Sequence, residues 1–383
     1  MTVRILADEN ITSVREHFAA LGEVITVPGR SITRDLLADC DALLVRSVTR
    51  VDAALLAGTR CRFVASATSG TDHVNTAELA AAGIGFSAAP GCNAISVVDY
   101  VFAALAALGS DRLADPDWRK LSFGVVGCGQ IGSVLVRRLL GLGVHVIVHD
   151  PLLPAAHPLA SRFRGLEEVL ACQVVSLHVP LTDSDPHATR HLLGTERLTA
   201  LRPGTILINA ARGSVVSNES LLARLSAAAN LVVVLDVWEQ EPALKLPLLE
   251  RIALGTPHIA GYSHEGKLRG TEQIREAFCR FFALPSPMPP GPSDSPQALL
   301  SVAADASAAE QLNSLLLAGY DIRQDDLALR QACREPDPAA AFDRLRKHYP
   351  KRHEYSHFRV STAGLGAALY PLLRTLGFCV GDP

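Results

Sequence analysis

Residues Phe123–Gly132 read FGVVGCGQIG and decide the fold of this chain. The stretch places a G-x-G-x-x-G pattern directly after an apolar, strand-like run and directly before a helical pattern at Ser133–Leu140. A second apolar run, Val144–His149, follows a glycine break and ends on Asp150. A strand, glycine loop, helix, strand and acid in this order are typical of a dinucleotide-binding βαβ unit.

Each glycine of this pattern has its own predicted role. Gly127 permits the tight turn, Gly129 lets the backbone approach a pyrophosphate, and Gly132 lets the helix pack closely on the strand. The N–H groups at the helix start then hold the phosphates. Asp150 accepts hydrogen bonds from a ribose and its charge repels a 2′-phosphate, so the expected cofactor is NAD(H) rather than NADP(H).

The composition excludes several classes of protein. The chain has 383 residues, 48% of them hydrophobic, which favours two or three domains with buried cores. A net charge of −3 gives no basic field for nucleic acid, and no apolar run reaches the ~18 residues of a membrane span. Eight cysteines without a C-x-x-C pair predict no metal site and no disulfide framework, and they favour a cytoplasmic location.

Short apolar runs alternate with helical patterns on both sides of the glycine pattern. The runs are residues 4–7, 42–45, 62–65 and 83–86 before it, and 174–179, 205–209, 231–236 and 256–259 after it. This alternation predicts two lobes, each a parallel sheet covered by helices. An apolar helix, residues 94–109, is long enough to cross from one lobe to the other.

A proline-rich stretch, residues 285–296, follows the second lobe and is predicted to be an extended linker. The residues beyond it show helical patterns and one strand pattern, so we expect a small α+β domain there. Its amphipathic stretches, Leu312–Leu317 and Leu369–Leu376, predict a homodimer contact, because so small a segment cannot bury all its apolar surface alone.

Three segments after the glycine pattern carry further chemistry. Arg212, Glu241 and His258 each follow an apolar run. Because the carboxyl ends of parallel strands converge on the ligand crevice, these three are expected to meet over the nicotinamide. His258 then removes a hydroxyl proton as hydride leaves, Glu241 orients the imidazole, and Arg212 binds a carboxylate or a developing carbonyl.

The order of these motifs resembles that of the D-isomer-specific 2-hydroxyacid dehydrogenases over about residues 1–283. The matching segments are Gly127–Gly132, Asp150, His178–Leu181, Asn209–Gly213, Asp236–Pro242 and Pro257–Gly261. The resemblance implies a Rossmann NAD lobe (98–261) inserted into a flavodoxin-like substrate lobe (1–97 and 262–284). It also implies the linker (285–296) and a C-terminal dimerisation domain (297–383).

Further segments resemble one branch of that family over the whole chain, among them residues 8–10, 45–49, 71–74, 85–94 and 344–347. This resemblance implies NAD-dependent oxidation of 4-phospho-D-erythronate to 2-oxo-3-hydroxy-4-phosphobutanoate, a step towards pyridoxal 5′-phosphate. It implies substrate contacts for Ser47, Thr68 and Tyr262. It implies NAD contacts for Gln130, Ile131, Asp150, Val179, Ala210, Ala211, Asp236 and Gly261. The chain departs from the branch at Asp99, where Glu is frequent, and at Val179, where a polar residue is common.

Two alternatives stay open. A different 2-hydroxyacid dehydrogenase, such as one for 3-phosphoglycerate, is disfavoured because the tail is too short for a serine-binding regulatory module. A cofactor-sensing, corepressor-like binding protein is disfavoured by the joint presence of Arg, Glu and His at the three positions above. The sequence does not locate the substrate phosphate. Arg46, Lys267 and Arg269 are the candidates, and each is equally explained as a surface charge.

Overall fold

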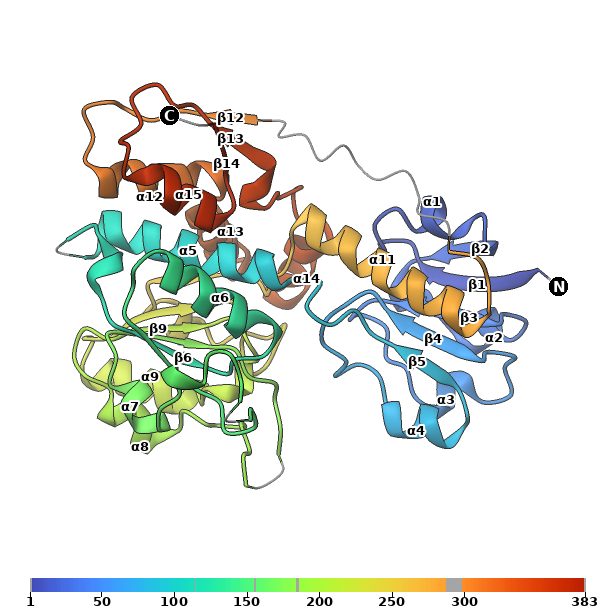
Figure 1. The fold of residues 1–383 in the computed structure, drawn as a ribbon. Helices are drawn as coiled ribbons and strands as arrows, with labels where there is room; N and C mark the ends of the chain where they lie inside the picture. The colour runs from blue at the N-terminus through green and yellow to red at the C-terminus, as the bar shows by residue number, and fades with distance from the viewer. Residues whose placement is uncertain (1, 114, 155, 184–185, 287–297, 382–383) are drawn as a thin grey trace. The chain divides into compact units, whose positions relative to one another are not determined.

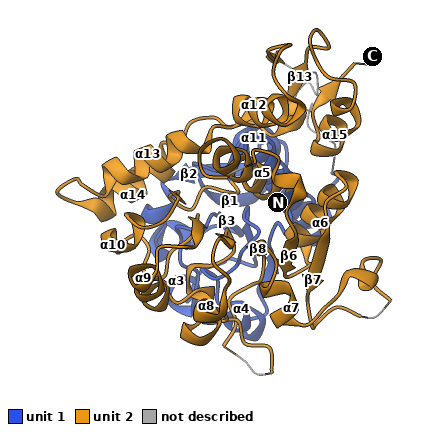
Figure 2. Ribbon diagram, turned by 90° about the vertical axis from the view of Figure 1, so that its left-hand side faces the viewer, with its two compact units in different colours: residues 1–94, 262–294 blue, residues 95–261, 295–383 orange. Residues whose placement is uncertain are grey.

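The computed structural model describes residues 2–113, 115–154, 156–183, 186–286 and 298–381. The chain forms two compact units, residues 1–94 with 262–294 (unit 1) and residues 95–261 with 295–383 (unit 2), coloured separately in Figure 2. Each unit is built on a parallel sheet (Figure 1), which confirms the predicted α/β class. The finer domain limits predicted from the sequence stay a proposal.

Unit 1 contains a five-stranded parallel sheet of order β2-β1-β3-β4-β5. Its strands are β1 (Val3–Asp8), β2 (Gly22–Val27), β3 (Ala42–Val45), β4 (Phe63–Ser66) and β5 (Gly85–Ser87). Its helices are α1 (Val14–Phe18), α2 (Arg34–Leu37), α3 (Ala53–Leu56), α4 (Thr76–Ala81) and α11 (His264–Phe281).

The alternation of side chains along each strand gives unit 1 a core on each face of the sheet. On β1, Ile5 packs with α1 and α11, whereas Leu6 packs with α2, α3 and α4. Both faces are therefore covered by helices, as a parallel sheet requires.

Unit 2 contains a six-stranded parallel sheet of order β11-β10-β9-β8-β6-β7. Its strands are β6 (Phe123–Val126), β7 (Val146–His149), β8 (Val174–Leu177), β9 (Ile206–Asn209), β10 (Val232–Leu235) and β11 (Leu254–Gly255). Its first helices are α5 (Ala94–Asp111), α6 (Gln130–Gly141), α7 (Leu166–Leu170), α8 (Thr195–Ala200), α9 (Asn218–Ala227) and α10 (Leu246–Leu249). The chain goes from β6 to β7 on one side and then to β8 on the other. The ligand crevice of such a sheet lies at that reversal.

Helix α5 is the core helix of unit 2. Among the described residues it is the one helix long and apolar enough to cross a membrane, and 83% of it is buried inside the protein. Burial of this kind is what a core helix of a globular unit shows.

The C-terminal segment is built into unit 2. It consists of α12 (Ala308–Gly319), α13 (Ile322–Ala332), α14 (Pro338–Lys347), α15 (Leu369–Leu376) and a parallel sheet of order β12-β13-β14 (Ala298–Leu300, Phe358–Val360, Cys379–Val380). Leu329 and Phe342 join the same apolar cluster as the strands of the six-stranded sheet. Asp326 accepts a 2.7 Å hydrogen bond from the N–H of Gly255, so α13 caps the sheet edge at β11.

Several predicted elements differ from the observed ones. The last strand of this sheet, predicted at 256–259, is observed two residues earlier as β11 (Leu254–Gly255). The N–H of Thr256 still bonds to Leu235 of β10, whereas the N–H groups of residues 258–260 bond to Asp236. Helix α12 begins at Ala308, because Ser307 forms a capping box with Glu310. The linker lies outside the described residues from position 287 onward.

The reason given for a homodimer contact does not hold. Leu312, Leu316, Leu369 and Leu373 are all buried within the single chain. Helix α15 packs on α12 and on α6, so the apolar faces that predicted a partner are covered by the chain's own helices. An amphipathic pattern shows that a face is buried but not what buries it.

A buried ion pair links α5 to α6, and its carboxylate also bonds to the C-terminal segment. Asp99 is 3% exposed and accepts a 2.6 Å hydrogen bond from Nη1 of Arg138, while its other oxygen accepts the N–H of Tyr355 at 3.0 Å. Burial raises the pKa of Asp99 to about 6, although the charge of Arg138 opposes the shift. Asp99, where related proteins frequently carry Glu, therefore lies at a packing contact between helices.

We expect the stability of the protein relative to an Asp99→Asn variant to fall as pH rises from 4 to 7. A carboxyl whose pKa is raised on folding contributes its stability below the unfolded pKa, near 3.9, and loses it as pH rises through the folded value. The rise of the Asp99 pKa to about 6 on folding corresponds to about 3 kcal/mol. Thermal unfolding of both proteins across this range measures the difference. The exposed Asp183→Asn serves as control, and a constant difference across the range for Asp99→Asn contradicts the prediction.

Candidate functional site

The glycine loop of unit 2 joins β6 to α6. Gly127 has a φ of +90°, and a Cβ built on it would lie 2.5 Å from the carbonyl oxygen of His178 and 2.9 Å from Cγ1 of Val179. A Cβ on Gly132 would lie 1.9 Å from the carbonyl oxygen of Gly127, so any side chain there would separate α6 from β6. Both positions require glycine for the fold itself.

Packing within the chain does not require a glycine at Gly129. A Cβ built on it would meet no atom of the described residues within 4 Å. The residue is exposed and stands directly before Gln130 and Ile131, the first residues of α6. The space above Gly129 is therefore open toward the helix N-terminus. This arrangement fits a pyrophosphate, which needs close backbone approach and donor N–H groups.

Asp150 follows the carboxyl end of β7. Its Oδ2 accepts a 2.8 Å hydrogen bond from the N–H of Cys128 in the glycine loop, and its Oδ1 accepts the N–H of Leu152. The carboxylate is thereby tied to the loop at the edge where the predicted ribose binds.

His178 ends β8 beside the glycine loop. Its Nε2 is 2.8 Å from Oγ of Ser176, and burial lowers the pKa of the imidazole to about 4. The ring is therefore neutral at physiological pH.

The segment after β9 carries Ala210, Ala211 and Arg212. The side chain of Asn209 shapes this turn, because its Nδ2 donates to the carbonyl of Arg212 and its Oδ1 accepts the N–H of Ala211. The two alanines are buried, and Arg212 is half-buried with its Nη1 donating to the carbonyl of Ala211 at 2.8 Å. The turn thus holds a guanidinium at the carboxyl end of the sheet.

Glu241 and His258 form a hydrogen-bonded pair. Nδ1 of His258 lies 2.7 Å from Oε2 of Glu241, and Oε1 accepts the N–H of Trp238 at 2.9 Å. With Nδ1 donating to the carboxylate, Nε2 carries the lone pair. The pair has the geometry of a general base with an orienting acid.

Several charges act on Glu241. Burial on its own would raise the pKa of Glu241, but the adjacent His258, the N–H of Trp238 and the positive charge of Arg346 bring it below its usual value. The carboxylate is therefore ionised at neutral pH. Arg346 lies on α14 and was not predicted from the sequence to act near this pair, because a basic residue on an amphipathic helix reads as a surface charge.

The turn that carries His258 is organised by Asp236. This aspartate is 1% exposed and follows β10. Its Oδ1 accepts the hydroxyl of Thr256 and the N–H of Ile259, both at 2.7 Å, and its Oδ2 accepts the N–H of Ala260 at 3.0 Å. The sequence implied an NAD contact for Asp236, whereas here its oxygens bond to the protein's own turn. Gly261 ends the turn.

The residues with implied substrate contacts lie in unit 1. Ser47 is exposed after β3, and Thr68 is half-buried after the neighbouring strand β4. Oγ1 of Thr68 lies 2.7 Å from Oγ of Ser66, which in turn lies 2.9 Å from Nε2 of His73. Two strand ends thus present hydroxyl groups at the carboxyl edge of this sheet.

Tyr262 stands before α11, and Nζ of Lys267 lies 4.6 Å from the centre of its ring. The other two candidates for a phosphate site also have contacts within unit 1. Arg46 donates to the carbonyl of Asn10 at 3.4 Å, and Arg269 donates to the carbonyl of Cys92 at 3.0 Å.

Comparison with known proteins places this geometry in context. The family described as "D-isomer specific 2-hydroxyacid dehydrogenase, NAD binding domain" matches residues 108–260, and a domain of unknown function (DUF3410) matches residues 294–377. The chain is 47% identical to the erythronate-4-phosphate dehydrogenase of Edwardsiella ictaluri, over 98% of this chain and 99% of that protein. It is 48% identical to the protein of the same name from Pseudomonas aeruginosa, again over 98% and 99%.

Solved structures show the same fold. The NAD⁺-bound 3-phosphoglycerate dehydrogenase of Entamoeba histolytica has a TM-score of 0.63 at 22% identity, covering 74% of this chain and 96% of that one. The D-lactate dehydrogenase of Aquifex aeolicus, complexed with NAD and lactic acid, has a TM-score of 0.58 at 22% identity, covering 73% and 95%. These structures show the shared fold, and the matched NAD-binding domain confirms NAD as the expected cofactor.

Asp150→Ala should weaken NADH binding while leaving NADPH binding equal or stronger. Hydrogen bonds to a charged group contribute about 1.5–3 kcal/mol, which corresponds to about 10–100-fold in affinity. Fluorescence titration with each reduced cofactor measures both dissociation constants. Glu167→Ala, which removes an exposed acid of unit 2, is the matched control. Unchanged discrimination in Asp150→Ala would rule out Asp150 as its source.

Proposed function

The chain belongs to the erythronate-4-phosphate dehydrogenase family of the D-isomer-specific 2-hydroxyacid dehydrogenases, and we propose that it oxidises 4-phospho-D-erythronate with NAD⁺. The product is 2-oxo-3-hydroxy-4-phosphobutanoate, an intermediate on the way to pyridoxal 5′-phosphate. The single observation that carries this proposal is the 2.7 Å contact between Nδ1 of His258 and Oε2 of Glu241 in an NAD-binding unit.

Proton removal is the task of His258 in this reaction. Its Nε2 accepts the proton of the C2 hydroxyl while the C2 hydrogen leaves as hydride, so the C2–O bond becomes a carbonyl. Glu241 keeps the lone pair on Nε2 and stabilises the imidazolium that forms. Bound NAD⁺ supplies the hydride acceptor.

Substrate orientation is the task of Arg212 and of the unit 1 residues. The planar guanidinium of Arg212 matches a carboxylate and the developing carbonyl oxygen. We assign Ser47, Thr68 and Tyr262 to the substrate, with its phosphate among Arg46, Lys267 and Arg269.

An NADH-formation assay tests the proposal against its alternatives. We expect turnover of 4-phosphoerythronate to exceed that of unphosphorylated erythronate and of 3-phosphoglycerate. A preference for 3-phosphoglycerate would assign a different dehydrogenase. Binding of NADH without turnover of any of the three would favour the cofactor-sensing alternative.

His258→Ala should lower kcat by at least ~10², because general-base catalysis contributes 10²–10⁴. Its affinity for NADH should stay near that of the wild type. Glu241→Gln should lower kcat less, since the imidazole remains. Steady-state kinetics and cofactor titration measure both quantities, with His187→Ala, a histidine outside the candidate site, as control. Near-normal turnover of His258→Ala at neutral pH would require another base.

We also propose a cytoplasmic homodimer that pairs through the C-terminal sheet. Strand β12 lies at one edge of that sheet, and its Leu299 is 69% exposed. An exposed edge strand with an apolar side chain favours pairing with a second copy, and twofold dimers are the commonest oligomers. The eight free cysteines support a reducing compartment.

Leu299→Lys should convert a dimer to a monomer, because it places a charge at the paired edge. Light scattering at micromolar concentration measures the mass. Leu152→Lys changes a similarly exposed leucine, 74% exposed, on the loop after β7 and should leave the dimer intact. A monomeric wild type, or a dimeric Leu299→Lys, would overturn this interface.

A further inference from the structure

The C-terminal segment places one buried arginine directly behind the turn that carries His258. Arg352 is 8% exposed and lies in the part of the chain that matches a domain of unknown function. We propose that Arg352 is a positioning residue, which fixes the backbone of the His258 turn so that the imidazole stays aligned for proton removal. The inference rests on the proposed function of His258.

The turn needs such support because of its backbone conformation. His258 has a φ of +57°, in the left-handed region that residues with a Cβ rarely adopt. Residues held in this region persist only when the surrounding structure over-determines them, at a cost of about 1–3 kcal/mol. Asp236 holds the N–H groups of the turn, because its carboxylate accepts hydrogen bonds from the N–H groups of Ile259 and Ala260.

Arg352 provides the matching support on the carbonyl side. Its Nη1 donates to the carbonyl of Ile259 at 3.4 Å, and its Nη2 donates to the carbonyl of Ala260. Nη2 also donates to the hydroxyl and the carbonyl of Ser96, and that hydroxyl donates to Ala260 at 2.9 Å. The two residues after His258 are therefore held between a carboxylate that binds their N–H groups and a guanidinium that binds their carbonyls.

Arg352 is itself firmly placed. Its guanidinium carbon lies 4.3 Å from the centre of the Tyr320 ring. The hydroxyls of Tyr320 and Tyr349 both donate to Asp325, which fixes the ring that the guanidinium faces. The ionised groups whose charges act on the guanidinium include Asp325 and Asp99.

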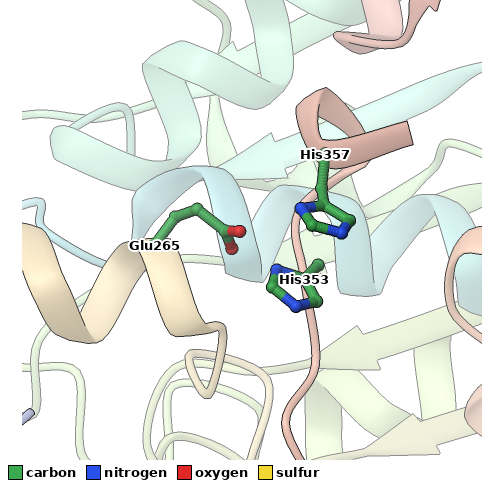
Figure 3. Close-up of side chains that lie close together, drawn as sticks. All are labelled: Glu265, His353 and His357. Atoms are coloured by element: carbon green, nitrogen blue, oxygen red, sulfur yellow. The ribbon is translucent and has the colours of Figure 1, made fainter. Parts of the chain in front are cut away.

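The chain around Arg352 is fixed as well. The rings of His353 and His357 stack at 3.6 Å with 13° between their planes (Figure 3), and the N–H of Tyr355 donates to Asp99. The segment that presents Arg352 is thus tied to α5 and stiffened by its own side chains.

A guanidinium is suited to this task in a way that an ammonium is not. Its planar fork reaches two carbonyls and a hydroxyl at once, whereas lysine offers a compact charge on a flexible stem. Arg352→Lys therefore keeps the buried charge but loses the fork, and Arg352→Met removes both charge and donors. A displacement of 1 Å in a reacting group costs about 10² in rate.

We expect Arg352→Met to lower kcat by about 10–100-fold and Arg352→Lys by an intermediate factor. The NADH dissociation constant of both variants should stay within about twofold of the wild type, because the glycine loop is formed by β6 and α6. Arg323→Met is the matched control, since Arg323 is an arginine of the same segment that pairs with Asp321 at the surface. It should leave kcat unchanged.

An NMR titration of ¹³C-labelled histidines separates positioning from general stability. The His258 resonance, assigned by its loss in His258→Gln, should titrate alike in the wild type and Arg323→Met. It should shift or broaden in both Arg352 variants. This readout needs no turnover, so it stands even if 4-phosphoerythronate is not oxidised and the proposed function fails.

Two results would overturn the inference. One is a folded, NADH-binding Arg352→Met with wild-type kcat and an unaltered His258 titration. The other applies if Arg352→Met does not fold: Arg352→Lys is then decisive, and wild-type values for both measurements in that variant would show that the fork does not position His258.

Discussion

The buried carboxylate of Asp236 is the interaction on which the candidate site of unit 2 depends. It sits at the carboxyl end of β10, and burial raises its pKa, opposed by the charge of His258, the hydroxyl of Thr256 and two backbone N–H groups. Asp236 also binds the N–H groups of residues 258–260 and so shapes the segment that follows β11. His258, the proposed general base, is therefore carried on a backbone that a buried residue holds.

Three buried charged residues of unit 2 share one pattern of bonding. Asp99, Asp236 and Arg352 are each bonded to backbone groups as well as to side chains. Asp99 binds both Arg138 and the N–H of Tyr355, and Arg352 binds backbone carbonyls and faces Tyr320. Buried charges are tolerated when several hydrogen bonds replace those lost with water. Such groups define one arrangement of helices and turns, because any displacement would leave a charge unsatisfied.

The sequence predicts the helices and strands well and the hydrogen bonds between them less well. Periodicity predicts the strand, loop, helix and strand at the glycine pattern and the apolar helix α5. It also shows that Arg212, Glu241 and His258 each follow a strand-like run. The last strand lies at 254–255 rather than at 256–259, because an apolar run does not reveal that Asp236 binds the N–H groups of residues 258–260. Arg352 could not be found, since a single arginine gives no sign in the sequence that it is buried.

Gly129 shows how the needs of the fold and of a ligand differ within one short motif. Its neighbours in the pattern are required by the protein's own packing, because a Cβ on Gly127 would meet the carbonyl of His178 and a Cβ on Gly132 would meet the carbonyl of Gly127. A Cβ on Gly129 would point into open space, so the packing of the chain itself does not need a glycine at this position. The proposed pyrophosphate contact accounts for that residue, which would then be selected by the bound molecule rather than by the fold.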